Sequence, residues 1–249
     1  MKTVFSGIQP TGKVHLGNLL GAINNWVSLS NEESKNYFCV VDLHSLTTHP
    51  DPSKMQENIQ ETIKVLVSSG INQKNSKIYI QSNVPEHVQL SWILSNFCQI
   101  GELQRMTQFK EKSDQLGSHA GILTYPILMA ADILIHKANE VPVGDDQTQH
   151  LELTRNIVER FNNAYTEYFP LPEKTSGKAG ARLMSLRHPD NKMSKSNDDL
   201  NGTIYFDDSK DEIIKKFKSS VTDSENEIKF DIENKKGISN LIDIYSTLH

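Results

Sequence analysis

Residues 6 to 21 read SGIQPTGKVHLGNLLG, and this stretch decides the fold that the rest of the chain completes. It follows a short strand predicted over Thr3 to Phe5, contains the turn formers Pro10 and Gly12, and runs into a helix predicted from about Gly17 to Leu29. Free backbone N–H groups and the positive end of a helix dipole meet at such a junction, which favours an anion. The stretch therefore predicts a phosphate site, although an ordinary surface turn explains the same residues.

Predicted strands and helices alternate along the following residues. Strands are expected at Tyr37 to Val41 and Lys77 to Gln81, and helices begin at Pro52 and at Val88. This order implies a Rossmann-like, doubly wound α/β fold, with a parallel sheet and helices on both faces. Ligands bind beyond the carboxyl ends of the strands in such sheets. We therefore expect three segments along one rim, namely residues 7–11, 42–44 and 81–83.

The composition is that of a globular protein, with 37% hydrophobic and 23% charged residues among 249. The longest apolar runs are too short to cross a bilayer, and the charged N-terminus lacks the apolar core of a signal peptide. Cys39 and Cys98 are far apart without a CxxC motif, which is typical of buried thiols in a reducing compartment. No histidine pair has the spacing of a zinc site. We therefore expect a cytoplasmic protein without a protein-bound metal.

A basic segment interrupts this acidic chain, whose net charge is −5. Between Lys174 and Ser196 there are six lysines or arginines and a single acid, Asp190. Such an island predicts a local polyanionic partner, and a solvated loop is the alternative. The segment ends in residues 192–196, KMSKS, whose two lysines and two hydroxyls suit a departing pyrophosphate.

A helix predicted to carry Pro126 in its first turn places Tyr125, Met129 and Asp132 on one face. A carboxylate in these apolar surroundings costs free energy unless a specific donor meets it. Asp132 is therefore either a ligand-binding residue or an acid at a helix edge that meets water or a salt bridge.

Residues 140–147 read EVPVGDDQ and predict a short strand followed by a close backbone approach at Gly144. Asp145 and Asp146 come next, just before a helix that carries residues 150–161. The two carboxylates suit ribose hydroxyls or a magnesium ion, and capping of that helix is the alternative.

The HLGN tetrad followed by KMSKS, in a parallel α/β chain, resembles the class I aminoacyl-tRNA synthetases. Within that class the chain looks most similar to the bacterial or organellar tryptophanyl-tRNA synthetases. Blocks along nearly the whole chain carry this resemblance: FSGIQPTG, YFCVVDLH, IQSNVPEH, IGELQRMTQFKEK, LTYPILMAADIL, VPVGDDQTQHLELTR, GARLMSL, KMSKS and VTDSE. Asn18 departs from the class signature but is similar to what this subfamily often has.

The resemblance implies two regions. Residues 1–200 are expected to form the Rossmann-like catalytic domain, and residues 201–249 the beginning of the helical anticodon-recognising region. That region looks incomplete, because the chain stops where family members continue, which leaves tight tRNA binding in question.

The resemblance also implies the reaction, in which ATP activates L-tryptophan to tryptophanyl-adenylate and the product passes to tRNA(Trp). No protein nucleophile is needed, so positioning and charge stabilisation must supply the catalysis. Catalytic roles fall on Gln9, Thr11, Lys192 and Lys195. The nucleotide-binding residues implied are Gln9, Pro10, Thr11, His15, Gly17, Asn18, Gly144, Asp145, Asp146, Leu183, Lys192, Met193, Ser194, Lys195 and Ser196, with Lys112 as a further phosphate contact and Mg²⁺ bridging the phosphates.

For the amino acid, the resemblance implies that Asp132 accepts the indole N–H and that Tyr125 and Gln147 meet the α-ammonium. The walls of the slot would be Phe5, His44, Met129, Val141 and Val143. A homodimer is implied too, and the apolar residues 88–106 form either its interface or core. Competing functions are a tyrosyl-tRNA synthetase, another nucleotidylyltransferase, and a non-catalytic RNA-binding or regulatory paralogue.

Overall fold

The computed structural model describes residues 1–175, 183–193 and 200–248 of the chain. Its centre is a five-stranded parallel sheet with the order β3-β2-β1-β4-β5. The strands are β1 (Lys2–Ile8), β2 (Ser34–Val40), β3 (Ser76–Ile80), β4 (Glu140–Pro142) and β5 (Glu173–Thr175). The strand order reverses between β1 and β4, the position at which doubly wound sheets bind ligands.

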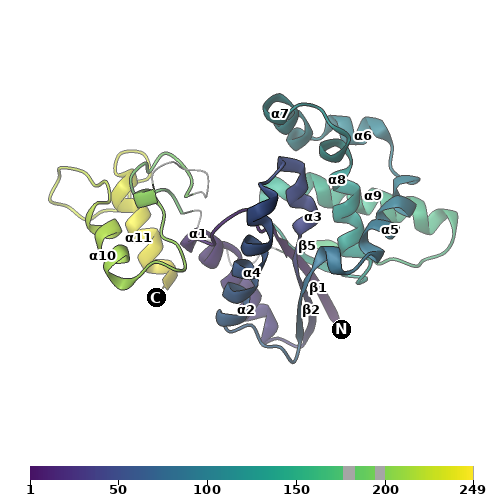
Figure 1. Cartoon of the computed structure of the whole chain (residues 1–249), viewed down its shortest axis with the longest axis horizontal. Coiled ribbons are helices and arrows are strands. Elements are labelled where there is room, and N and C mark those ends of the chain that lie inside the picture. The colour runs from purple at the N-terminus through teal and green to yellow at the C-terminus, as the bar shows by residue number, and fades with distance from the viewer. Residues whose placement is uncertain (176–182, 194–199, 249) are drawn as a thin grey trace.

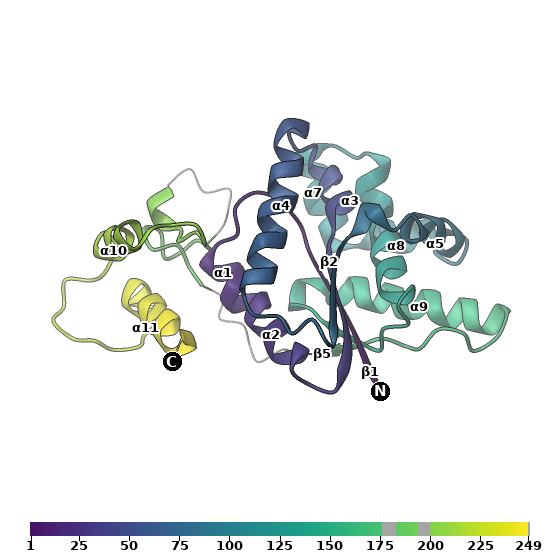
Figure 2. The same cartoon turned by 60° about the horizontal axis from the view of Figure 1, so that its bottom comes forward.

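Helices cover both faces of this sheet, as the two views show (Figure 1, Figure 2). Alternate residues of β2 explain the arrangement, because their side chains point to opposite faces. Cys39 belongs to the core beneath α8, whereas Phe38 and Val40 belong to the core on the other side. The first face carries α5 (Glu86–Ser95), α8 (Ala120–Leu134) and α9 (Thr148–Ala164), and the second carries α2 (Asn24–Ser30) and α4 (Pro52–Ser68). The predicted fold class is confirmed.

The helix predicted from Pro52 is present as α4, and residues at both of its ends explain where it starts and stops. The Asp51 carboxylate accepts a hydrogen bond from the Ser53 N–H at 2.9 Å, and Pro52 occupies the first turn. Gly70, two residues beyond the helix, takes a φ of +89°, which few other residues tolerate. The apolar face between these ends is buried against β2.

The helix predicted after residue 16 is also present, as a continuous run of three segments. They are α1 (Leu16–Asn18), a π-helical segment η1 (Leu19–Ile23) and α2. Trp26 of this run stacks on Phe38 of β2 with ring centroids 4.7 Å apart. This packing fixes the helix that follows the Gly/Pro turn against the sheet.

The predicted position of Pro126 is wrong. Pro126 lies inside α8 rather than in its first turn, because the helix begins at Ala120. His119 caps this earlier start, with its Nδ1 accepting the N–H of Ile122 at 3.3 Å. Histidine is not among the residues usually found at that position, so no clear start signal stands before Ala120. Tyr125, Met129 and Asp132 still share one face.

The C-terminal part of the chain packs on the HLGN segment. Leu20 shares a core with Leu183, Leu186, Met193, Ile204 and Ile244. The Leu16 N–H donates to the Ile204 carbonyl at 2.8 Å, which joins the two regions through the backbone. The C-terminal helices are α10 (Lys210–Lys218) and α11 (Lys236–Leu248), and they lie at the opposite end of the molecule from α5 (Figure 1). The boundary at residue 200 stays a prediction.

The remaining short elements connect these layers. They are α3 (Asp42–Ser45), η2 (Leu46–Thr48), η3 (Gln81–Asn83), α6 (Ile100–Arg105), α7 (Thr107–Leu116), η4 (Asp145–Gln147) and η5 (Leu200–Gly202). Within the described ranges, no helix is both long and apolar enough to cross a membrane.

Candidate active site

A cavity of about 310 Å³ opens at the carboxyl ends of β1 and β4, where the strand order reverses. All eight residues predicted to hold the amino acid line it: Phe5, His44, Tyr125, Met129, Asp132, Val141, Val143 and Gln147. They come from β1, α3, α8, β4, η4 and, for Val143, the link between the last two, so segments far apart in the sequence converge on one site. The cavity is mostly apolar with a few polar groups, as is usual for small-molecule sites.

Asp132 is the buried acid of this cavity, with 1% of its surface exposed. Its Oδ1 accepts hydrogen bonds from Gln81 Nε2 and His87 Nδ1, and its Oδ2 from His44 Nε2, each at 2.7 Å. Burial alone would raise the pKa of Asp132, but the hydrogen bonds from the two histidines hold it below its ordinary value. A carboxylate has about four lone-pair positions, so this anion can accept one further donor. Asp132 does not lie in water at a helix edge, whereas ion pairs with His44 and His87, the other part of that alternative, are present.

The segments after β2 and β3 supply two of these donors, His44 and Gln81, and the two segments hold each other in place. The Leu43 N–H donates to Gln81 Oε1 at 3.2 Å, and the Ser82 N–H donates to Asp42 Oδ1 at 3.0 Å. This contact confirms that the segments following the two strands lie along one rim. His44 and Gln81 are thereby held beside Asp132, each bound to one of its carboxylate oxygens.

Tyr125 forms a second polar centre of the cavity, two helical turns before Asp132 on α8, and its ring lies edge-on to the His44 ring with centroids 6.1 Å apart. Its hydroxyl lies 2.9 Å from Gln108 Oε1 and 2.7 Å from His150 Nε2. The Lys112 ammonium lies 4.4 Å from the centre of the Tyr125 ring, a cation–π geometry. Burial lowers the pKa of Lys112, and burial followed by the Lys112 charge lowers the pKa of His150 to about 4.

The two signature motifs meet at Gly17. The Asn18 side chain accepts the His15 N–H at 3.2 Å, which closes the first turn of the HLGN helix. A Cβ atom on Gly17 would lie 3.0 Å from the His15 ring and 3.9 Å from Cβ of Met193, so only glycine fits easily here. Met193 is buried against Leu183, whose carbonyl accepts its N–H at 2.9 Å. The start of KMSKS therefore packs on the helix that follows the Gly/Pro turn.

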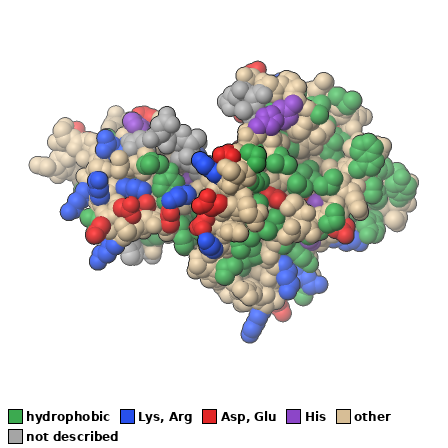
Figure 3. All heavy atoms as spheres, viewed as in Figure 1, with side chains coloured by type: hydrophobic (Ala, Val, Ile, Leu, Met, Phe, Trp, Pro, Cys, Tyr) green, Lys and Arg blue, Asp and Glu red, His purple; other side chains and the backbone are tan. Residues whose placement is uncertain are grey.

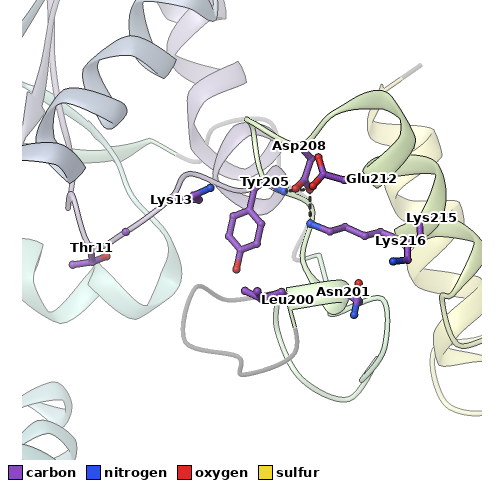
Figure 4. A pocket seen from close by; sticks show the side chains of 10 residues that line it. Thr11, Lys13, Leu200, Asn201, Tyr205, Asp208, Glu212, Lys215 and Lys216 are labelled. Carbon is purple, nitrogen blue, oxygen red and sulfur yellow. Dashed lines mark hydrogen bonds and ion pairs between the residues drawn. The ribbon is translucent and has the colours of Figure 1, made fainter. Parts of the chain in front are cut away.

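The other residues predicted to bind the nucleotide lie in several different places. Gln9 and Gly144 line the amino-acid cavity. Thr11 lines a second cavity of about 540 Å³, which it shares with Lys13, Tyr205 and residues of α10 (Figure 4). Pro10 is buried and Lys192 is exposed. Ser194, Lys195 and Ser196 lie outside the described residues.

Asp145 and Asp146 do not cap α9, so that alternative is wrong. The N-cap residue of α9 is Gln147, which makes no capping hydrogen bond, and the two acids form η4 before it. The Asp145 carboxylate instead accepts from the Lys174 ammonium at 2.5 Å. Asp146 accepts from the Gln147 side chain at 2.8 Å through Oδ2.

Several residues of the site were not predicted from the sequence. Trp26 and Gln108 line the amino-acid cavity, and His87 and His150 stand directly behind Asp132 and Tyr125. They lie on four separate helices, α2, α7, α5 and α9. No local spacing links them to the cavity, because the contacts depend on packing between separate helices.

Comparison with known proteins gives consistent results. The family model for "tRNA synthetases class I (W and Y)" matches residues 1–249. The tryptophan-tRNA ligase of Oceanobacillus iheyensis is 51% identical over 248 residues, covering 99% of this chain and 76% of that protein. The tryptophan-tRNA ligase of Halalkalibacterium halodurans is 52% identical over 246 residues, covering 98% and 74%.

Solved structures agree with these sequence matches. Tryptophanyl-tRNA synthetase from Mycoplasma pneumoniae superposes with a TM-score of 0.87 at 39% identity, covering 100% of this chain and 73% of that one. The Campylobacter jejuni enzyme, solved with ADP and tryptophan, gives a TM-score of 0.83 at 35% identity, covering 99% and 74%. A tyrosyl-tRNA synthetase from Archaeoglobus fulgidus, at 18% identity and a TM-score of 0.74, shares the fold.

Proposed function

Because the chain belongs to the class I tRNA synthetase family for tryptophan and tyrosine, we propose that it acts as a tryptophan-tRNA ligase. It activates L-tryptophan with ATP and transfers the amino acid to tRNA(Trp). The observation that carries the proposal is the cavity at the switch point of the sheet, which joins apolar walls to a buried, ionised Asp132. Identity of about 50% to tryptophan-tRNA ligases over nearly the whole chain supports the same choice.

The indole ring occupies the apolar part of the cavity. Asp132 accepts the indole N–H through its remaining lone pair, while Met129, Val141 and Val143 contact the ring faces. An analogue without the N–H leaves this anion short of a donor, which costs affinity. His44, expected only as a wall of the slot, in addition holds the Asp132 carboxylate.

The amino end of the substrate lies near Tyr125 and Gln147, both of which line the cavity. With the ammonium held there, the carboxylate oxygen is directed toward the α-phosphate of ATP. This oxygen attacks the phosphorus in line, the bond to the β-phosphate oxygen breaks, and pyrophosphate leaves. The protein contributes position and charge, as in other phosphoryl-group chemistry.

ATP lies between the HLGN helix and the start of KMSKS, and residues 144–146 hold its ribose. The packing of Gly17 against Met193 supports this placement, because it brings the helix N-terminus and the lysine-bearing segment together. Lys192 and Lys195 neutralise the departing pyrophosphate, and Lys112 contacts a phosphate. Mg²⁺, brought in with ATP, would add positive charge that stabilises the leaving pyrophosphate. The 3′-terminal adenosine of the tRNA then takes the amino acid from the adenylate.

A homodimer in the cytoplasm is the proposed form of the protein. Exposed apolar side chains on α5 and α6 support an interface, namely Val88, Trp92, Ile93 and Ile100. Figure 3 shows hydrophobic side chains gathered on the end of the molecule where α5 lies. Leu94, Leu103 and Met106 of the same segment are core residues.

The test is ATP–pyrophosphate exchange with each of the twenty amino acids. We expect exchange with tryptophan at a rate far above that with tyrosine. Exchange with tyrosine alone would make the protein a tyrosyl-tRNA synthetase. Exchange with none would leave the non-catalytic paralogue as the better account.

A further inference from the structure

The Tyr125 hydroxyl belongs to a chain of three hydrogen bonds that joins α9, α8, α7 and η4. His150 Nε2 lies 2.7 Å from Tyr125 Oη, and Oη lies 2.9 Å from Gln108 Oε1. The Gln108 Nε2 group donates to the backbone carbonyl of Asp146 at 3.2 Å. The chain thus runs from a buried histidine to the loop that follows β4.

The Asp146 carbonyl fixes the direction of every proton in this chain. A carbonyl only accepts, so the amide nitrogen of Gln108 faces it and Oε1 faces Tyr125. Tyr125 therefore donates its single proton to Gln108. His150 must then donate from Nε2 to the Tyr125 oxygen, because that oxygen has no second proton to give.

The opposite direction fails at both ends. It would set the Gln108 oxygen against the Asp146 carbonyl oxygen and move the His150 proton to Nδ1. That nitrogen is buried and has no hydrogen-bond partner among the residues the structure describes. The repulsion between the two carbonyl oxygens decides against this direction, and the buried Nδ1–H without an acceptor would carry a cost of about 1 to 3 kcal/mol.

We propose that Gln108 is a positioning residue that sets the polarity of Tyr125. Because Gln108 Oε1 accepts the hydrogen bond from the Tyr125 hydroxyl, one lone pair of the hydroxyl oxygen is directed to the α-ammonium of tryptophan. The second lone pair accepts from His150. This inference rests on the proposed function, since it states how the same cavity recognises the amino end of its substrate.

The charges around Tyr125 make the direction of its O–H bond important for binding the α-ammonium. The Lys112 ammonium lies over the ring and repels a second cation. A hydroxyl that turned its hydrogen toward the substrate would add to that repulsion. With its lone pair exposed, the same hydroxyl favours the ammonium and disfavours an anion at this end of the cavity. The neutral state of His150, whose pKa burial lowers to about 4, keeps another positive charge away.

A double-mutant cycle on the whole chain tests the proposal. The variants are Gln108→Met, Tyr125→Phe and the two combined, with Gln104→Met as a matched control on the exposed side of α6. The ligands are tryptophan and indole-3-propionate, which keeps the indole and carboxylate but lacks the ammonium. Dissociation constants are measured by calorimetry for each variant and ligand.

In Gln108→Met we expect the Kd for tryptophan to rise by about tenfold, the worth of one hydrogen bond. The Kd for indole-3-propionate should change by less than about twofold, and Gln108→Met should have little further effect once Tyr125 is Phe. Gln104→Met should bind both ligands as the unchanged chain does.

Two results would overturn the proposal. One is an equal loss of affinity for both ligands in Gln108→Met, and the other is an undiminished effect in the Tyr125→Phe background. Either would reduce Gln108 to a residue that only supports α7. The failure of the proposed function would look different. The unchanged chain would then bind neither ligand and would exchange pyrophosphate with tyrosine instead of tryptophan.

Discussion

The Nε2 atom of His44 lies 2.7 Å from Oδ2 of Asp132, in a pair that is almost wholly buried. His44 follows β2 and Asp132 lies on α8, so the bond joins the rim of the sheet to the helix that crosses it. An isolated carboxylate in such a place would be neutral. Because His44, His87 and Gln81 all donate to it, Asp132 stays an anion next to an apolar cavity.

The first prediction concerns this anion. Asp132→Asn keeps the size of the side chain but removes its charge, so the bond to the indole N–H weakens. Hydrogen bonds to charged groups contribute about 1.5 to 3 kcal/mol, so the KM for tryptophan should rise by about 10- to 100-fold. The KM for ATP should stay within about threefold, as expected for a distant subsite. Pyrophosphate exchange measures both, and parallel changes would show that Asp132 does not contact the indole.

The second prediction concerns the meeting point of the two motifs. Gly17→Ala adds a Cβ atom 3.0 Å from the His15 ring, so the HLGN turn must shift by a few tenths of an ångström. We expect the KM for ATP to rise by about tenfold, because well-oriented donors lose strength with small displacements. The KM for tryptophan should change little.

Gly21→Ala provides the control for this change. It makes the same substitution in the same helical run, and a Cβ atom there meets nothing within 4 Å. It should leave both KM values unchanged and stabilise the protein by up to about 1 kcal/mol through helix propensity. If both alanine variants behaved alike in pyrophosphate exchange, close packing at Gly17 would have no part in ATP binding.

The third prediction concerns stability below neutral pH. Burial lowers the pKa of His136 and of His150 to about 4, whereas both titrate near 6.5 in the unfolded chain. Between these values the unfolded state binds more protons, so stability falls as pH falls from 6.5 to 4. Each histidine contributes at most about 1.4 kcal/mol per pH unit, and the partly exposed His136 contributes less. The lowered pKa of Asp132 also stabilises the folded state, and this stabilisation is lost only as the pH falls below 3.8, the pKa of the carboxyl in the unfolded chain.

Urea unfolding at pH 7, 6 and 5 measures this slope. His136→Phe should flatten it, because a ring without a titrating nitrogen retains the stacking on Tyr37 at 4.0 Å. His49→Asn, at an exposed position with a φ of +49° that asparagine tolerates, should leave the slope unchanged. A slope that His136→Phe does not alter would mean that this histidine titrates alike in both states.

The fourth prediction concerns assembly. Trp92 is 76% exposed on α5 and is the largest side chain of the proposed interface. Trp92→Glu should convert the dimer to monomers in sedimentation equilibrium, because it places a charge at the centre of an apolar contact. Ile228→Glu, at an 84% exposed position in the C-terminal part, should leave the dimer intact. A monomeric unchanged chain would refute the assembly proposal.

Local patterns explain which parts of the structure were predictable. The helix start at Pro52 and the alternation of strands and helices can be recognised within a few residues of sequence. The alternation predicted the parallel sheet and its ligand-binding edge. The acid on the apolar face of α8 could be singled out because burial demands donors. Its actual donors could not, since Gln81 lies in η3 after β3 and His87 lies on the separate helix α5.

The hydrogen-bond chain at Tyr125 could not be predicted for the same reason. Gln108 and His150 reach it from α7 and α9, and their positions depend on how three helices pack together. The start of α8 was mispredicted for a local reason. Pro126 is typical of a first turn, and the weaker signal of a capping His119 placed the start six residues earlier.

The most direct measurement compares binding of tryptophan with that of its isostere in which sulfur replaces the indole nitrogen. The two ligands share shape, ammonium and carboxylate, and differ in the one donor that Asp132 is proposed to accept. Calorimetry on the unchanged chain should show tryptophan binding at least about 30-fold more tightly, the worth of about 2 kcal/mol. Equal affinities would mean that Asp132 does not accept a hydrogen bond from the indole N–H, and the assignment of the cavity to tryptophan would be contradicted.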